Sequence, residues 1–230
     1  MTPIIAGFVM AAALLFVAAM KSESRVILLL LAITAGIIAF AGSAKSDTYL
    51  SLHGGLSVWD CTSNACEVES RRPDGLRAQA AIGKHLSEEW AVEAELSWQK
   101  HDIHGINPGD GRNLTGDGNT LEAFSLMGNV AYHLPQLSVL HPYVMAGAGV
   151  TRQIVTGGGK RPLDDEMWTL AGQVGVGARY PLTESWSLDS RYVYWRALGT
   201  EVDAPRGLGN GLDLEHDSHS VLIGVVWKWR

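Results

Sequence analysis

The clearest pattern in the chain is a pair of alternating segments between residues 168 and 195. In the first segment, apolar and polar side chains alternate with a period of two, which is the period of a β-strand. The second segment follows a turn at 181–185 and repeats the pattern, so the two together predict a β-hairpin. One face carries Trp168, Leu170, Val174, Val176, Trp186, Leu188 and Tyr192, and the other carries Gln173, Gly175, Arg179, Asp189 and Arg191.

The charged and glycine-rich face of this hairpin decides between two kinds of sheet. A soluble sheet buries its apolar face in a core, whereas a barrel that crosses a membrane turns its apolar face to lipid and its polar face to the lumen. The pattern favours the membrane barrel, and aromatic residues are then expected to form girdles at the two interfaces. The predicted girdle residues are Trp90, Trp98, Tyr132, Trp168, Tyr180, Trp186, Tyr192, Tyr194, Trp227 and Trp229.

Alternating segments recur along the chain and predict eight strands. They cover residues 47–59, 76–86, 90–99, 120–134, 143–154, 168–180, 186–195 and 221–229. The connections after the second, fourth and sixth strands are short, and the other four connections are long loops. Such alternation is typical of an outer-membrane barrel, whose turns face the periplasm and whose loops face outward. The sequence therefore predicts an all-β fold: an eight-stranded antiparallel transmembrane up-and-down β-barrel, closed by pairing of its first and last strands.

Residues 1–46 differ from the rest in containing two long apolar runs. A short polar segment with Lys21 and Arg25 separates the runs, and small residues follow the second one. A basic segment, an apolar run and a small-residue cleavage site make up a secretory signal peptide. We therefore expect an apolar extension, a translation start at Met20, cleavage between Ala44 and Ser46, and a barrel domain at 47–230. The alternative is a pair of transmembrane helices, because each run approaches the roughly 20 residues that span a bilayer.

The predicted barrel domain is acidic. Residues 1–46 hold three of the 18 basic residues and one of the 24 acidic residues, so 15 basic and 23 acidic residues remain, a net charge of −8. This balance argues against nucleic-acid binding. Cys61 and Cys66 lie in the first long loop. Secretion would place them in an oxidising compartment, where a disulfide between them is expected.

Charged residues on the predicted inner face are expected to pair inside the barrel. An eight-stranded barrel has an interior just wide enough for side chains to fill, so buried charges at a similar height need partners. The predicted lumen network consists of Arg77, Glu93, Glu95, Arg179, Asp189 and Arg191. This network has two interpretations: a structural plug, or a gate that admits small ions. The plug is favoured because eight strands seldom leave an open pore.

Two loops contain histidines three residues apart with a carboxylate between them. His101 and His104 begin the second loop, and His216 and His219 end the fourth. Such pairs could bind zinc or copper if the loops met above the barrel mouth. Scattered histidines are common in polar loops, so no metal site and no cofactor is predicted.

The residues near the outer rim bear on an enzymatic role. A lipid-modifying enzyme needs a serine or histidine oriented by an acid at that position. The residues that come closest to this requirement are Ser218, His219 and Ser220. They match no lipase motif and lie where polar residues are expected at the start of a strand. The sequence therefore predicts no enzyme.

Residues 47–230 resemble a known family. The segments PYVMAGAGV, LAGQVGVGARYPL, WSLDSRYVYW and VLIGVVWKW are similar to the small eight-stranded outer-membrane proteins of Gram-negative bacteria, the opacity-type, OmpA-like and OmpX-like barrels. The resemblance implies a location in the bacterial outer membrane, contact with its lipid and lipopolysaccharide, and assembly by machinery that reads a terminal aromatic residue. Trp229 fills that position and is followed by Arg230.

The same resemblance implies a surface protein with a structural or interaction role. That role would be envelope integrity, adhesion or surface contact through the four extracellular loops. The alternative is a narrow porin-like channel for small solutes. The segments specify the architecture of the protein more closely than its activity.

Overall fold

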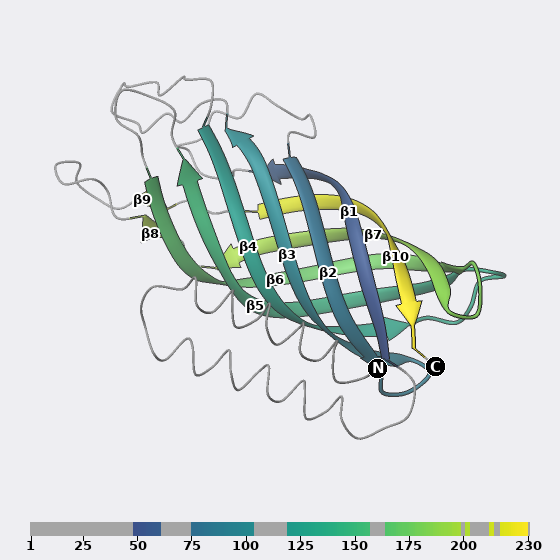
Figure 1. Cartoon of the computed structure of the whole chain (residues 1–230). Helices are drawn as coiled ribbons and strands as arrows, with labels where there is room; N and C mark the ends of the chain where they lie inside the picture. Colours follow the sequence, from purple (N-terminus) through teal and green to yellow (C-terminus); the bar gives the residue numbers. More distant parts are fainter. Residues whose placement is uncertain are drawn as a thin grey trace. The chain divides into compact units, whose positions relative to one another are not determined.

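The computed structural model describes residues 48–60, 75–103, 119–156, 164–198, 201–202, 212–213 and 217–229. Most of these residues belong to one closed antiparallel barrel (Figure 1). No helix within the described segments is long and apolar enough to cross a membrane. The predicted signal segment at 1–46 and the loop with Cys61 and Cys66 lie outside the described residues.

Eight strands form the barrel, each paired with the next along the chain. The last strand, β10, pairs with β1 and closes the ring, so the eight-stranded antiparallel barrel predicted from the alternation is confirmed. A separate two-stranded sheet consists of β8 (Glu201–Val202) and β9 (Leu212–Asp213). The barrel strands are β1 (Thr48–Asp60), β2 (Gly75–His85), β3 (Trp90–Ile103), β4 (Asn119–His133), β5 (His141–Thr156), β6 (Asp164–Pro181), β7 (Trp186–Leu198) and β10 (Asp217–Lys228).

Several strands end at other residues than the alternation indicated: β3 and β7 run on to Ile103 and Leu198, and β10 begins at Asp217. β5 and β6 continue further toward the long loop between them than the alternation indicated, and they stay paired up to Thr156 and Asp164. Trp229 follows the last strand instead of lying in it, and its backbone N–H donates to the carbonyl of Thr48 at 3.1 Å. The C-terminal end of the described barrel is therefore tied to the beginning of β1.

The pairing register determines how the strands are inclined. Directly paired residues, followed from Tyr49 through every strand in turn, lead back to β1 at Trp59. This offset of ten residues is the shear of the barrel, and together with the strand number it sets the tilt and the radius. A barrel with eight strands is narrow enough for its own side chains to fill the interior.

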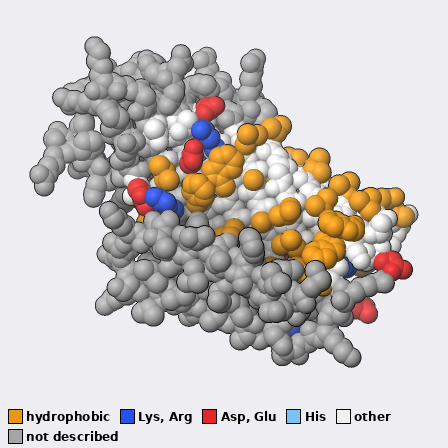
Figure 2. All heavy atoms as spheres, in the orientation of Figure 1, with side chains coloured by type: hydrophobic (Ala, Val, Ile, Leu, Met, Phe, Trp, Pro, Cys, Tyr) orange, Lys and Arg blue, Asp and Glu red, His pale blue; other side chains and the backbone are white. Residues whose placement is uncertain are grey.

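The two faces of each strand differ sharply in their side chains. Leucine, valine and isoleucine side chains such as Leu170, Val176 and Ile223 are exposed on the outside, while their neighbours along the strand are buried in the lumen. Apolar side chains cover much of the described outer surface seen in Figure 2. An exposed apolar surface of this extent indicates contact with lipid or another apolar partner.

Candidate functional site: the charged lumen

Two arginines and two carboxylates form the most connected group in the lumen. Arg179 donates from Nε to Asp189 Oδ2 at 2.9 Å and from Nη2 to Glu93 Oε1 at 3.3 Å. Arg191 lies 3.4 Å from Asp189 through Nε and 3.7 Å from Glu93 through Nη1. These four side chains are at most 5% exposed. Each carboxylate is therefore shared by both arginines in a site closed to solvent.

Two tyrosines complete this group. Tyr49 donates its hydroxyl to Glu93 Oε1 at 2.7 Å, and Tyr143 donates to Asp189 Oδ1 at 2.9 Å. The guanidinium of Arg179 lies 4.5 Å from the ring centroid of Tyr49 and 5.2 Å from that of Tyr143, a cation–π arrangement with both rings. The tyrosines thus bind the carboxylates through their hydroxyls and the arginine through their rings.

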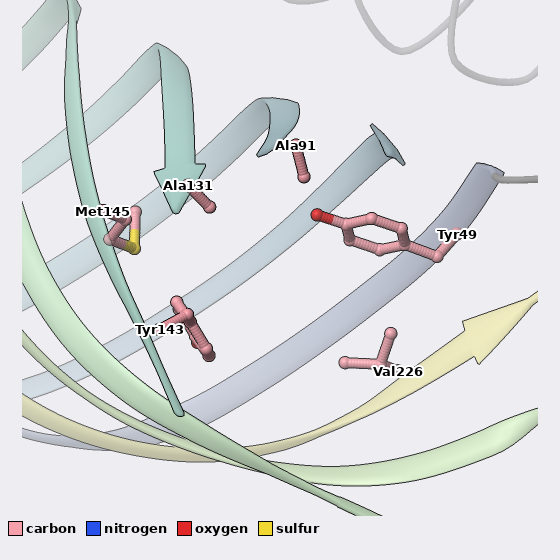
Figure 3. Close-up of a cluster of buried hydrophobic side chains, with 6 residues drawn as sticks. All are labelled: Tyr49, Ala91, Ala131, Tyr143, Met145 and Val226. Atoms are coloured by element: carbon pink, nitrogen blue, oxygen red, sulfur yellow. The ribbon is translucent and has the colours of Figure 1, made fainter. Parts of the chain in front are cut away.

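Glycines on the neighbouring strands explain why these large rings fit against the wall. A Cβ atom at Gly83 on β2 would lie 2.3 Å from the Tyr49 ring, and one at Gly177 on β6 would lie 2.4 Å from the Tyr143 ring. Glycine is thus required on the strand beside each tyrosine. Figure 3 shows the two rings within a buried cluster whose other members are Ala91, Ala131, Met145 and Val226.

A second group lies around Glu95. Arg77 donates from Nη2 to Glu95 Oε1 at 3.2 Å and to Gln173 Oε1 at 2.7 Å. Asn129 and Gln173 donate their amide N–H groups to Glu95 Oε2 at 2.8 and 3.0 Å. All four side chains are buried. This carboxylate is therefore neutralised by one arginine and held in place by two amides from other strands of the barrel.

A buried histidine contacts the first group. His53 Nε2 lies 3.1 Å from Asp189 Oδ1. His53, Gly224 and Asp189 are direct neighbours in the pairing of β1, β10 and β7. A Cβ at Gly224 would lie 2.4 Å from the imidazole, so this glycine leaves the space through which the ring reaches the carboxylate.

Aromatic rings lie in the lumen at the short-turn end of the barrel. His85 and His133 occupy the last positions of β2 and β4, and their ring centroids are 5.0 Å apart. His85 also lies 5.1 Å from the Tyr49 ring, and His133 lies 5.6 Å from the Tyr143 ring. The four rings form a continuous row between the charged group and the short-turn end of the barrel.

The structure brings all six predicted lumen charges inside the barrel in two separate groups. Arg179, Asp189, Arg191 and Glu93 form one group, and Arg77 pairs with Glu95 in the other. Within the described strands, no ion pair joins the two. Sequence reasoning missed the polar partners Tyr49, His53, Asn129, Tyr143 and Gln173. All five lie on the inner face of the period-two pattern, which is the signal that could have found them.

The half of the lumen nearer the long loops is lined by hydroxyl, amide and imidazole groups. Ser57 Oγ lies 2.9 Å from Ser220 Oγ and 3.0 Å from His101 Nε2, and Ser218 donates to Gln99 Oε1 at 3.0 Å. All of these side chains are buried. This half of the lumen therefore differs from the ion-paired layers nearer the short turns.

The histidines and serines considered for metal binding or catalysis do not come together. His219 is on the outer face, where it contacts the hydroxyl of Tyr192, whereas Ser218, Ser220 and His101 point into the lumen. His104 and His216 lie outside the described residues. Among the residues that the structure describes, no group of three or more metal-ligating side chains is found.

Five of the predicted girdle residues form ring contacts at the short-turn end of the barrel. At the short-turn end, Trp90 lies 4.9 Å from Tyr132, and Trp227 lies 6.1 Å from Trp186 and 4.6 Å from Trp229, measured between ring centroids. Trp98, Trp168 and Tyr194 lie on the loop-side halves of their strands, Tyr180 is on the turn side of β6, and Tyr192 is at the middle of β7.

A closed barrel with an apolar exterior, aromatic residues near its ends and a charged lumen is a transmembrane barrel of the outer-membrane type. Residues 26–228 match the family model described as "Outer membrane protein beta-barrel domain". The chain belongs to this family and is located in the bacterial outer membrane, surrounded by its lipid and lipopolysaccharide.

Solved structures of two bacterial proteins share the fold. Neisserial surface protein A is 15% identical, with a TM-score of 0.54, and the alignment covers 80% of this chain and 98% of that one. A major outer membrane protein from Thermus thermophilus is 14% identical, with a TM-score of 0.53, and the coverage is 81% and 100%. No curated protein matches the chain.

Proposed function

We propose that this protein is a non-conducting surface barrel that serves a structural or interaction role through its four extracellular loops. The observation that carries the proposal is the sharing of Glu93 and Asp189 by both Arg179 and Arg191 in the buried lumen. An ion path would have to separate these pairs. Removing one partner of a buried pair costs about 3–5 kcal/mol, so a closed lumen is the stable state.

The row of rings at the periplasmic end supports the same proposal. His85 and His133 lie against Tyr49 and Tyr143, directly beside the ion pairs. A solute would have to displace both layers. The charged groups therefore act as a plug, and the part of the molecule available for contacts is its loops.

A narrow channel for small solutes is the second candidate function. The polar lining of the extracellular half, with Ser57, Ser218 and Gln99, favours it because such groups can replace water around a solute. This lining leads to the ion-paired layer, so conduction requires that layer to rearrange.

Single-channel recording in planar bilayers separates the two functions. The purified barrel, shown to be folded by its heat-dependent gel mobility, is expected to give no steady conductance steps. Steady steps whose ion selectivity changes in the Glu93→Gln variant would refute the plug and support the channel.

Cell assays test the surface role. We expect deletion of the gene to lower either detergent resistance or surface attachment. A variant with residues 104–118 replaced by a short Gly-Ser linker separates the two roles. An integrity role predicts that this variant restores detergent resistance, and an adhesion role predicts that it does not restore attachment. A deletion strain that is unchanged in both assays would refute the proposal.

No catalytic step enters this proposal. Ser218 and His219, the nearest candidate pair, are adjacent in β10 and point to opposite faces of the barrel wall. Successive residues of a strand always alternate in this way. These two side chains cannot act together on one substrate.

A further inference from the structure

The turn between β4 and β5 differs in composition from the other two periplasmic turns. The turns at 86–89 and 182–185 have the sequences LSEE and LTES and include Glu88, Glu89 and Glu184. The connection at 134–140 is longer, has the sequence LPQLSVL and contains no charge. Acidic side chains suit a turn that faces water, and an uncharged, leucine-rich turn suits an apolar surrounding.

This turn has a defined hairpin structure. Leu137 and Leu140 exchange two backbone hydrogen bonds of 2.9 and 3.0 Å. Ser138 at the tip has a φ of 57°, and Gln136 donates its side-chain amide to the Ser138 carbonyl at 2.6 Å. These hydrogen bonds define the backbone of the turn, from which its apolar side chains project.

Those apolar side chains are strongly exposed. Leu137 is 66% exposed, Val139 52%, Leu140 43% and Leu134 41%. Contiguous exposed apolar groups on a protein mark a surface that contacts a membrane or a partner.

The neighbouring surface indicates which contact this is. Tyr132 and Val130 precede the turn on the outer face of β4, and Val144 follows it on the outer face of β5. Tyr132 packs against Trp90 in the girdle at this end of the barrel. The apolar turn is therefore continuous with the surface that faces lipid, and apolar side chains extend to the short-turn end in Figure 2.

We propose that the β4–β5 turn inserts into the periplasmic leaflet of the outer membrane and anchors the barrel there. Leu137 and Val139 contact glycerophospholipid at the boundary between headgroups and acyl chains, the depth at which apolar faces of interfacial segments are buried. One side of the barrel is thereby held at a fixed depth in the bilayer.

Methyl NMR of the protein in phosphatidylethanolamine–phosphatidylglycerol nanodiscs tests the proposal. The methyl signals of Leu137 and Val139 are expected to weaken several-fold with nitroxide-labelled lipid, as those of the lipid-facing Val130 do. A water-soluble gadolinium chelate is expected to leave them nearly unchanged. Weakening by gadolinium alone would place the turn in water, and protection from both probes would indicate a second copy of the chain. Either result overturns the proposal.

A double variant, Leu137→Glu with Val139→Glu, tests whether the turn is kept in lipid by its own side chains or by the strands beside it. The charged turn is expected to leave the lipid, so that the methyl signals of Leu140 become sensitive to gadolinium while those of Val130 remain protected. The conservative variant Leu137→Ile is the matched control and should retain the wild-type pattern. If Leu140 keeps full lipid contact in the double variant, the strands hold it there and the anchor does not exist. Heat-dependent gel mobility verifies that each variant is folded.

Discussion

Asp189 is contacted by four lumen side chains, so its neutralisation is the sharpest test of the plug. The carboxylate is fully buried and contacts Arg179, Arg191, Tyr143 and His53 at distances between 2.9 and 3.4 Å. In Asp189→Asn the two arginines keep Glu93 as their shared carboxylate, and one positive charge in the group is left uncompensated. Removing one partner of a buried ion pair costs about 3–5 kcal/mol, and we expect a loss of this size in the free energy of unfolding.

An exposed ion pair provides the matched control. Arg152 donates to both carboxylate oxygens of Glu166 at 2.7 Å, a better geometry than any pair in the lumen, but the Glu166 side chain is 42% exposed. Exposed pairs contribute about 0–1 kcal/mol. Glu166→Gln should therefore cost far less than Asp189→Asn, because burial rather than distance sets the cost.

Urea unfolding in phospholipid vesicles, followed by tryptophan fluorescence and by gel mobility, measures both variants. A loss below about 1 kcal/mol for Asp189→Asn, or equal losses for the two variants, would show that the lumen is hydrated enough to screen its charges. The plug would then have no energetic basis. The double variant Asp189→Asn with Arg179→Gln should recover part of the loss, because it restores the charge balance.

Three further measurements test the closed barrel, its packing around Tyr49 and the expected disulfide. The purified protein should migrate faster in SDS before heating than after, because a closed ladder of backbone hydrogen bonds has no edge for detergent to attack; identical mobility would contradict a closed barrel. Gly83→Ala should destabilise the protein by about 1–3 kcal/mol, because its Cβ would overlap the Tyr49 ring at 2.3 Å. Gly54→Ala, with open space around its Cβ, is the control, and equal effects would refute the packing argument. Cys61 and Cys66 should resist alkylation until a reductant is added, and a mass increase in untreated protein would exclude the disulfide.

The inner and outer faces could be predicted because their signal is local. A side chain on a β-strand points to the side opposite that of its neighbour, so the positions of Glu93, Glu95 and Arg179 on the inner face follow from the chain alone. Arg179 and Asp189 are at similar distances from the turn at 181–185, so counting from this turn places them nearly opposite each other, and they are paired directly across the β6–β7 hairpin.

Which individual side chains pair across the lumen could not be predicted, because the pairing depends on the register of every strand. Arg77 on β2 meets Glu95 on the next strand but also Gln173 on β6, which lies 96 residues away in the sequence. Nothing in the spacing of these residues indicates the contact. The division of the charges into two groups has the same origin.

The chain by itself determined the class of fold, the number of barrel strands and the face on which each charge lies, because these depend on alternation between neighbouring residues. The closed tertiary structure decided which charges meet, which glycines admit Tyr49, Tyr143 and His53, and that the β4–β5 turn continues the lipid-facing surface. The physical reason is closure itself: eight strands with a shear of ten residues place distant segments at the same height around a lumen only wide enough for their side chains.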